Sequence, residues 1–446
     1  MGARARSVRQ SSPVVVIGGI RRLGGLGMFF AIDLDAFYCG VEERRDPSLR
    51  GEPFCVVQKQ CVASLSYPAR ALGVVKLSNI GDVLKQHPKM RTVNGENLAK
   101  YRQAGQEIFR FVQQLVGVPV ERLGLEELRF DLTEQIAQLR RGFPADDVLS
   151  EWLADDDFMD AVGGRGAKLG DADFPDFYFQ FDGYSVPPGH TTPQTLPLTA
   201  YIAGNLAAYI RDRIWFDLGY ACSVGAGASK NLAKMACGVH KPRGVTLVVP
   251  GYEREFVAGM PLRKVPGMGR ASRAVFDDLG LGDGRVGDLL DKVDERGFLD
   301  RLAPVLGDRA PGLYSLLQGE DRDGRVINGY VRPQQISIEE SYPVYCAERD
   351  WPQETRRLAR AVVDQATIDW YDDDARVWSA VPATARVACV FANQAYVRKS
   401  RSRPFAWTAD AGIDEFVDRL ASTALLLLRE VAATGRPRVI NVALLQ

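Results

Sequence analysis

The chain has 446 residues, of which 46% are hydrophobic, so it can bury several separate cores. Its 56 basic and 56 acidic residues give a formal net charge of zero. The three histidines argue against a histidine-ligated metal centre, and no apolar run is long enough to cross a membrane. Seven cysteines are scattered without a Cys-x-x-Cys pair, which argues against a disulfide framework or a zinc site and favours reduced thiols inside a cell.

Residues 1–27 contain five arginines and no acidic residue. An arginine-rich start without acids is typical of a mitochondrial transit peptide. A disordered basic leader and a mispredicted start upstream of Met28 are the other interpretations. We expect a disordered leader and keep mitochondrial targeting as the alternative.

Two acidic clusters stand in apolar surroundings, at residues 31–38 and 121–132. Apolar residues around carboxylates predict strands or strand ends in an α/β core. If the two strands lie side by side, Asp33, Glu126 and Glu127 come together. They could then hold two hard divalent cations, as in two-metal phosphoryl transfer. Taken singly, the first cluster also fits a turn or cap, and the second fits a solvated face.

Residues 66–76 stand between the acidic clusters and include Tyr67, Arg70 and Lys76. Their spacing lets them face one way from a short helix, with Pro68 in its first turn, and from its exit. Arginine binds phosphate oxygens in pairs and lysine acts as a point charge, so beside two metal ions these residues suit a nucleoside triphosphate site. The alternative is an ordinary exposed helix start.

Residues 141–185 carry eleven acidic residues against three basic ones, a net charge of −8 that leaves +8 for the rest of the chain. Their many glycines and aspartates predict a surface insertion that is partly disordered and has no part in catalysis. The positive balance elsewhere suits a nucleic-acid partner.

Residues 262–270 contain a Pro-Gly-x-Gly turn between two expected helices. The backbone amides around Gly267 and Gly269 can make a concave anion site for a DNA phosphate. Glycine-rich helix connections are also common without any ligand, so this reading stays open.

Residues 333–446 read as a β-sheet with helices. The expected strands are 336–341, 385–391 and 439–445, and the expected amphipathic helix is 355–371. Within this region the basic stretch 396–403, with Arg398, Lys399 and Arg401, is expected to face phosphates. A solvated hairpin tip is the alternative.

Three motifs in this order resemble the Y-family translesion DNA polymerases. They are Asp-Leu-Asp-Ala-Phe-Tyr at 33–38, Tyr-Pro-Ala-Arg-Ala-Leu-Gly-Val at 67–74 and Val-Glu-Arg-Leu-Gly-Leu-Glu-Glu at 120–127. The stretches at 57–59, 93–98 and 238–242 are similar to the iota branch of that family. The resemblance runs from about Met28 to the end, apart from one poorly matching stretch in the middle.

The resemblance implies an α/β multidomain fold, the right-hand polymerase, with four parts. These are a palm of mixed sheet and helices at 28–37 and 98–236, with the acidic insertion at about 138–195; small fingers at 38–97; a helical thumb with a helix-hairpin-helix at 237–325; and an α+β little finger at 333–446.

The resemblance also implies roles for single residues. Asp33, Glu126 and Glu127 would be catalytic and, with the carbonyl of Leu34, would hold two Mg²⁺ or Mn²⁺ ions. The implied nucleotide-binding residues are Tyr38 (which would reject a ribose 2′-hydroxyl), Tyr67, Arg70, Lys76 and Lys230. The implied base-pair pocket is Gln58, Lys59 and Leu77, and the implied DNA contacts are Gly267, Gly269, Arg398, Lys399 and Arg401. Lys234 is expected to have a structural role, and Phe37 to belong to the core.

Two residues depart from the family pattern. The first acid of the pair is normally Asp and is Glu126 here, and the usual Asn before Lys230 is Ser229. Because Mg²⁺ demands near-ideal octahedral geometry, the longer Glu126 predicts weak activity with Mg²⁺ and better activity with Mn²⁺.

The function that the resemblance implies is template-directed translesion DNA synthesis with low fidelity and no proofreading. One alternative, motivated by Glu126, is a catalytically weak or inactive relative that acts as a DNA-binding repair scaffold. Another is a different palm-based nucleotidyl enzyme such as a cyclase. The implied partners are primer–template DNA, deoxynucleoside triphosphates, a sliding clamp and other translesion polymerases, for a nuclear, monomeric protein without a membrane.

Overall fold

The computed structural model describes residues 27–141, 198–248, 250–321, 326, 334–342, 344–372, 376–392, 397–410, 412–433 and 435–445. The chain divides into two compact units. The first takes Met1–Asn97 and Ala104–Tyr330, and the second takes Leu98–Gln103 and Val331–Gln446. The predicted basic leader and nearly all of the predicted acidic insertion lie outside the described residues.

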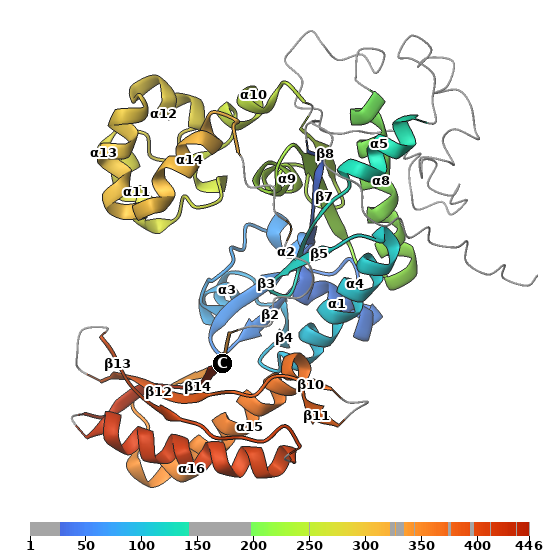
Figure 1. Ribbon diagram of the computed structural model, residues 1–446. Helices are drawn as coiled ribbons and strands as arrows, with labels where there is room; N and C mark the ends of the chain where they lie inside the picture. Colours follow the sequence, from blue (N-terminus) through green and yellow to red (C-terminus); the bar gives the residue numbers. More distant parts are fainter. Residues whose placement is uncertain are drawn as a thin grey trace, which may run out of the picture. The chain divides into compact units, whose positions relative to one another are not determined.

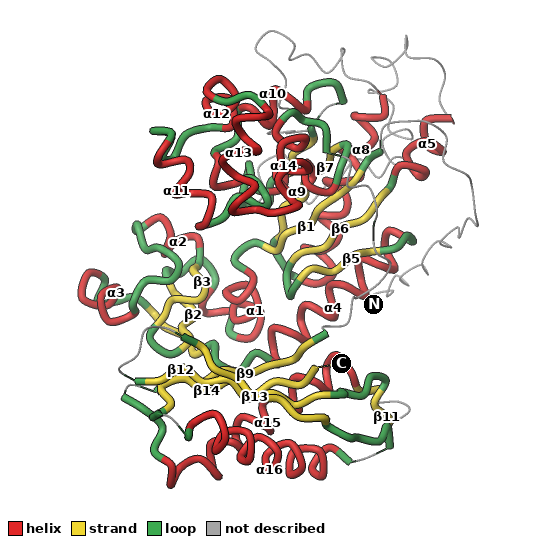
Figure 2. The backbone as a smooth tube through the Cα atoms, turned by 60° about the vertical axis from the view of Figure 1, so that its left-hand side comes forward, coloured by secondary structure: helices red, strands yellow, loops and turns green. Residues whose placement is uncertain are grey.

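The first unit is built around a mixed sheet of five strands in the order β5-β6-β1-β7-β8. Strands β7 and β8 are parallel, and the other neighbours are antiparallel. The strands are β1 (Phe29–Leu34), β5 (Val120–Leu123), β6 (Glu127–Asp131), β7 (Cys222–Gly227) and β8 (Val245–Leu247). Figure 2 shows β1, β6 and β5 side by side.

The sheet includes a strand after residue 236, where the expected palm ends. Val245, Thr246 and Leu247 pair with β7 as a parallel edge strand. The stretch after helix α9 (Lys230–Cys237) therefore returns to the sheet before the helical region begins.

The central strands are apolar on both faces because helices cover them. Phe29, Phe30, Ala31 and Ile32 of β1 are all buried, and Phe30 stacks on Phe130 of β6 with ring centroids 5.5 Å apart. The surrounding helices of this part are α1 (Phe37–Arg45), α4 (Ala99–Val116), α5 (Thr133–Arg141), α8 (Leu198–Arg213), the π-helix η4 (Ile214–Leu218) and α9 (Figure 1).

Helix α9 lies unusually close to β7. A Cβ atom built on Gly225 of β7 would lie 2.0 Å from the carbonyl oxygen of Ala233 and 2.3 Å from the backbone nitrogen of Cys237. Only glycine allows this approach, because any side chain would overlap the helix backbone.

A smaller sheet follows α1 in the chain and has the strand order β3-β2-β4. Its elements are η1 (Pro47–Leu49), β2 (Phe54–Gln58), β3 (Cys61–Leu65), α2 (Tyr67–Ala71), α3 (Ile80–Gln86) and β4 (Arg91–Asn94). The predicted short helix at Tyr67 is confirmed: Ser66 caps it, and Pro68 lies in its first turn.

The rest of the first unit is helical. Its elements are α10 (Glu253–Ala258), η5 (Leu262–Lys264), α11 (Arg270–Asp278), α12 (Val286–Lys292), α13 (Glu295–Leu306), η6 (Gly307–Arg309) and α14 (Ala310–Leu317). Phe256, Leu262, Leu289, Phe298 and Leu316 belong to one apolar core that these helices share. The predicted turn at 265–269 joins η5 to α11.

The second unit is an antiparallel sheet in the order β13-β12-β14-β9, with helices α15 and α16 on one face (Figure 1). Its elements are β9 (Gln335–Ser341), η7 (Glu348–Asp350), α15 (Trp351–Trp370), β10 (Tyr371–Asp372), β11 (Val377–Trp378), β12 (Thr384–Phe391), β13 (Arg398–Pro404), α16 (Ile413–Ala432) and β14 (Pro437–Leu445).

The three predicted strands of this unit are confirmed, and the predicted helix begins earlier than expected, at Trp351. Pro352 suits its first turn. Within the part of the chain that the structure covers, no helix combines the length and the apolar character needed to span a bilayer.

We expect Gly225→Ala to lower the free energy of unfolding by about 3 kcal/mol, because the added methyl group meets backbone atoms of α9 that cannot rotate away. Gly412→Ala is the matched control: a Cβ atom there has no neighbour within 4 Å, so stability should stay unchanged. Calorimetric unfolding of both variants measures the difference, and equal stabilities would contradict the close approach.

Candidate active site

Three acidic side chains come from the two strands that the sequence predicts to be neighbours. Asp33 lies near the end of β1, and its Cα partner on β6 is Glu127. Glu126 precedes β6 in the turn from β5, and its backbone carbonyl accepts a hydrogen bond from the amide of Leu34 at 3.0 Å. The adjacency of the two acidic clusters is therefore confirmed.

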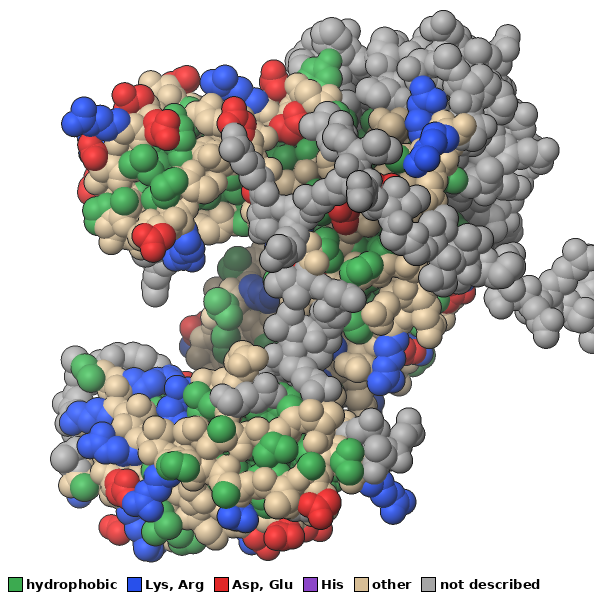
Figure 3. Space-filling model, in the orientation of Figure 1, with side chains coloured by type: hydrophobic (Ala, Val, Ile, Leu, Met, Phe, Trp, Pro, Cys, Tyr) green, Lys and Arg blue, Asp and Glu red, His purple; other side chains and the backbone are tan. Residues whose placement is uncertain are grey.

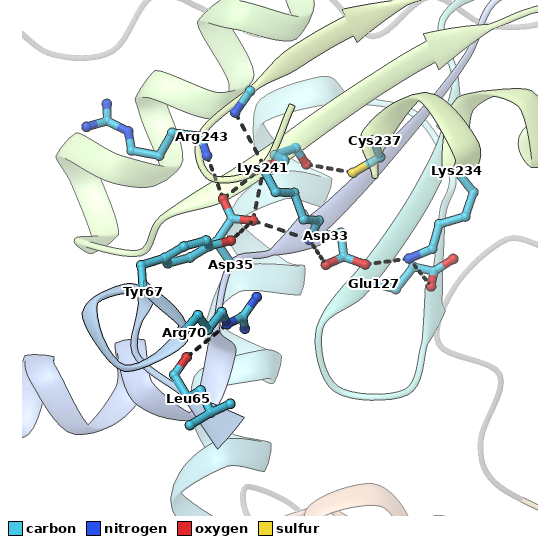
Figure 4. A network of polar contacts seen from close by, with 12 residues as sticks. Asp33, Asp35, Leu65, Tyr67, Arg70, Glu127, Lys234, Cys237, Lys241 and Arg243 are labelled. Atoms are coloured by element: carbon cyan, nitrogen blue, oxygen red, sulfur yellow. Dashed lines mark hydrogen bonds and ion pairs between the residues drawn. The ribbon is translucent and has the colours of Figure 1, made fainter. Parts of the chain in front are cut away.

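Two lysines supply positive charge between these carboxylates (Figure 4). Lys234 on α9 donates a hydrogen bond to Asp33, and its Nζ lies 2.6 Å from Oε2 of Glu127. Lys241, which follows α9, donates to Asp33, and its Nζ lies 3.2 Å from Oδ1 of Asp35. Largely buried carboxylates this close repel one another, and the two ammonium groups neutralise them.

The lysines decide the protonation of Asp33. Burial alone would raise the pKa of Asp33, but the ammonium groups of Lys241 and Lys234 outweigh it and hold this pKa below its usual value. Burial would likewise lower the pKa of both lysines, yet the charge of Asp33 beside them raises it. All three groups are therefore charged at neutral pH.

Glu126 has a different electrostatic environment. Burial, followed by the negative charge of Asp33, raises the pKa of Glu126, and the charges of Lys76 and two other lysines offset this only in part. The ionised form of Glu126 would therefore gain from an additional cation in the site.

The acids and lysines line a cavity of about 900 Å³. The predicted site residues on its wall are Asp33, Leu34, Tyr38, Gln58, Tyr67, Arg70, Lys76, Leu77, Glu126 and Glu127. Phe37, predicted to belong to the core, is buried, although it too touches the cavity.

The part of the cavity wall opposite the acids comes from the smaller sheet and its helix α2. The guanidinium carbon of Arg70 lies 4.7 Å from the ring centre of Tyr67, and its Nε donates to the carbonyl of Leu65. Gln58 is held by a hydrogen bond from its side-chain nitrogen to the carbonyl of Gly95 (2.9 Å). Leu77 is 76% exposed at the rim.

Two residues predicted for the nucleotide site and the base-pair pocket do not line the cavity. Lys59 is exposed in the turn between β2 and β3, where its backbone nitrogen donates to Glu96. Lys230 is buried, and its Nζ lies 3.2 Å from Oε2 of Glu121 in a pair whose side chains are 6% and 9% exposed.

In the structure Lys234, and not Lys230, lies beside the carboxylates of the cavity. Lys234, one helical turn further along α9, reaches the carboxylates and lines the cavity, although the sequence predicts a structural role for it. Lys230 instead neutralises a buried glutamate, which is a structural task.

The predicted DNA contacts lie on other elements. Gly267 has a φ of +88°, which favours glycine, and Gly269 is the N-cap of α11. Arg398, Lys399 and Arg401 lie on β13, which is an edge strand exposed at every residue rather than a hairpin tip.

The basic character of β13 is partly balanced within its own unit. Arg398 pairs with Glu339 and Arg403 pairs with Glu430, whereas Lys399 lies over the ring of Phe391. Figure 3 shows basic side chains gathered on the part of this unit where Figure 1 draws β13.

Sequence reasoning missed four residues of this network: Asp35, Ser223, Lys241 and Arg243. Asp35 and Lys241 lie inside motifs that carry the family resemblance, so the sequence alone could have predicted that they belong to the site. Ser223 and the backbone of Arg243 gave no signal, because they reach Asp35 only through contacts about two hundred residues apart in sequence.

The donor set suits hard divalent cations, although it is not arranged to hold one as it stands. Across the residues that the structure covers, no group of three or more acidic, histidine or cysteine side chains forms a ready metal site. The carboxylates nevertheless converge on cationic groups, since the ammonium of Lys234 bridges Asp33 and Glu127. Oxygen ligands around a shared positive charge fit the chemistry of Mg²⁺ or Mn²⁺.

Comparison with known proteins finds relatives among the DNA polymerases. The family model described as impB/mucB/samB matches residues 32–238. DNA polymerase iota of Homo sapiens is 26% identical over 341 residues, covering 76% of this chain and 41% of the relative. DNA polymerase iota of Drosophila melanogaster is 28% identical over 350 residues, with the same shares. DNA polymerase IV of Pseudomonas fluorescens (strain Pf0-1) is 27% identical over 320 residues, covering 70% of this chain and 69% of the relative.

Residues 32–238 therefore match the impB/mucB/samB domain of the Y-family DNA polymerases, and the chain is similar to such polymerases over 70–76% of its length. Its similarity extends to the iota branch, as the motifs at 57–59, 93–98 and 238–242 predict. The chain spans about two fifths of the length of the iota relatives.

We expect Lys230→Met to lower the free energy of unfolding by about 3 kcal/mol, because it leaves the buried Glu121 carboxylate without its ammonium partner. The double variant Lys230→Met with Glu121→Leu removes both charges and should recover most of that stability. Denaturant unfolding measures both effects. A stable single variant that binds nucleotide poorly would contradict the structural role and restore the triphosphate role expected from the sequence.

Proposed function

We propose that the chain is a template-directed DNA polymerase of the translesion type. It would add deoxynucleotides to a primer 3′-hydroxyl and release pyrophosphate, with low fidelity and without proofreading. The observation that carries this proposal is the single cavity in which Asp33, Glu126 and Glu127 face Tyr67 and Arg70. Acidic metal ligands opposite phosphate-binding side chains suit phosphoryl transfer.

Asp33, Glu126, Glu127 and the carbonyl of Leu34 would hold two divalent cations, Mg²⁺ or Mn²⁺. Such ions, when bound, activate the attacking hydroxyl and stabilise the leaving phosphate. Lys234 and Lys241 contact the oxygens of Asp33, so two cationic side chains lie beside the proposed metal ligands.

The incoming triphosphate would lie against Tyr67, Arg70, Lys76 and Lys241. Arg70 presents a guanidinium held over the ring of Tyr67, which limits its motion before a phosphate arrives. The three cationic side chains would offset the negative charge of a triphosphate, and the hydroxyl of Tyr67 could donate a hydrogen bond to it.

Two further groups on the wall suit the sugar and the base. Tyr38 follows the buried Phe37 on α1, and the two rings lie 6.0 Å apart, so the core backs the surface on which the sugar would rest. Gln58 and Leu77 would bound the base pair. We propose that the hydrogen bond that holds Gln58 fixes one side of this base-pair pocket.

The expected domains translate into the elements as follows. The five-stranded sheet would be the palm, the β3-β2-β4 sheet with α2 and α3 the fingers, the helices α10–α14 the thumb, and the second unit the little finger. The amides around Gly267 and Gly269, and the side chains of Arg398, Lys399 and Arg401, would contact DNA phosphates. We also propose that the protein is a nuclear monomer that binds a sliding clamp and other translesion polymerases.

A second function has one observation in its favour: Glu126 stands where the family has the shorter Asp. A relative with weak or no catalysis that binds primer–template as a repair scaffold would tolerate this arrangement.

Primer extension tests the first function against the second. We expect extension by the unmodified chain and a loss of about 1,000-fold or more in Asp33→Ala, because a group that would contact both cations is removed. Asp82→Ala is the matched control, since Asp82 is an exposed aspartate that does not line the cavity. Primer–template binding without extension, in either metal, would favour the scaffold.

Comparison of Mg²⁺ with Mn²⁺ tests the role of Glu126. We expect the unmodified chain to extend faster with Mn²⁺, and Glu126→Asp to raise the Mg²⁺ rate, because the shorter side chain suits the stricter geometry of Mg²⁺. Glu127→Asp is the matched control and should lower the rate with both ions. An unchanged or lower Mg²⁺ rate in Glu126→Asp would exclude this explanation.

A further inference from the structure

Asp35 is a carboxylate that the proposed chemistry does not use. It directly follows β1, its side chain is fully buried, and it does not line the cavity. A buried carboxylate is unfavourable unless it is paired and hydrogen-bonded, so its partners indicate its task.

Four groups from three separate segments converge on Asp35 (Figure 4). The hydroxyl of Ser223 on β7 donates to it at 2.9 Å, and the backbone nitrogen of Arg243 donates at 2.8 Å. The ammonium of Lys241 lies at 3.2 Å, and the hydroxyl of Tyr67 on α2 donates at 3.4 Å.

Two of these four partners line the cavity and two do not. Lys241 and Tyr67 are on the cavity wall, among the groups proposed to bind the triphosphate. Ser223 and the Arg243 backbone lie behind it and hold the carboxylate in place. Asp35 therefore joins a loop of the larger sheet to a helix of the smaller one through a single charged group.

The backbone around Asp35 is fixed independently of its side chain. Its own amide donates to the carbonyl of Ala221 (2.8 Å), and the amide of Val224 donates to Gly244 in the loop that carries Lys241 (2.9 Å). The amide of Gly244 donates in turn to the hydroxyl of Ser223 (3.3 Å). Replacing the carboxylate by an amide would thus alter the hold on Lys241 more than the fold.

We infer that Asp35 is a positioning residue, which rests on the proposed function. Asp35 holds Lys241 and Tyr67 at the cavity wall and so favours binding of the nucleoside triphosphate. It does this without contacting the nucleotide or the reacting atoms. The ion pair with Asp35 holds the ammonium of Lys241 at the wall independently of its contact with Asp33.

The test is steady-state primer extension with Asp35→Asn over a range of deoxynucleotide concentrations. We expect the KM for the nucleotide to rise about tenfold, because the charge that holds Lys241 is lost, while kcat and primer–template affinity change little. Asp131→Asn is the matched control: Asp131 is on the same sheet, accepts a hydrogen bond from Thr133 and does not line the cavity. Its KM should stay unchanged.

A double-mutant cycle separates positioning from general support of the fold. If Asp35 acts through Lys241, then Asp35→Asn should add little to the KM of Lys241→Met. A fully additive loss, or an equal fall in kcat and primer–template binding, would overturn the inference.

If Asp35→Asn unfolds at too low a temperature to be assayed, Ser223→Ala tests the same positioning of Asp35. We expect a smaller rise in the KM for the nucleotide at unchanged kcat, and an unchanged KM would overturn the inference.

Failure of the proposed function is distinguishable from failure of this inference. If the unmodified chain extends no primer, the proposed function itself fails. Extension with an unaltered KM in Asp35→Asn would reject only the role of Asp35.

Discussion

The repulsion between Asp33 and Glu127 is the constraint on which the rest of the site depends. Antiparallel pairing of β1 with β6 makes them Cα partners, so two carboxylates stand side by side in a largely buried place. Such a pair is tolerable only with positive charge between its members. The fold supplies that charge from a distant segment, through Lys234 on α9 and Lys241 behind it.

Three features of the fold accompany the approach of those lysines to the acids: a glycine in β7, a buried ion pair on α9 and a hydrogen-bonded loop after α9. Gly225 lets α9 approach β7 to within the reach of Lys234. Lys230, a turn earlier on the same helix, is buried, and Glu121 neutralises it there. The loop after α9 must also pass close to β1, and Asp35 and Ser223 fasten it by hydrogen bonds to its backbone. The helix and the loop that carry the two lysines are thus each fixed by close contacts of their own.

The lysines that neutralise the acids also line the cavity. Their charges do not offset every acid equally, because burial and the charge of Asp33 raise the pKa of Glu126 in spite of them. The helical region of the first unit and the second unit each have an apolar core of their own.

The sequence by itself determined what depends on short-range patterns. Apolar runs around carboxylates predict β1 and β6, and the Ser-Tyr-Pro stretch predicts α2. Motif order predicts the family, and with it ten of the residues that line the cavity. Only the tertiary structure decided which lysine reaches the acids, because Lys230 and Lys234 share one helix and differ only in what lies opposite. It alone also revealed the partners of Asp35, since contacts over 188 and 208 residues of separation leave no trace in local sequence.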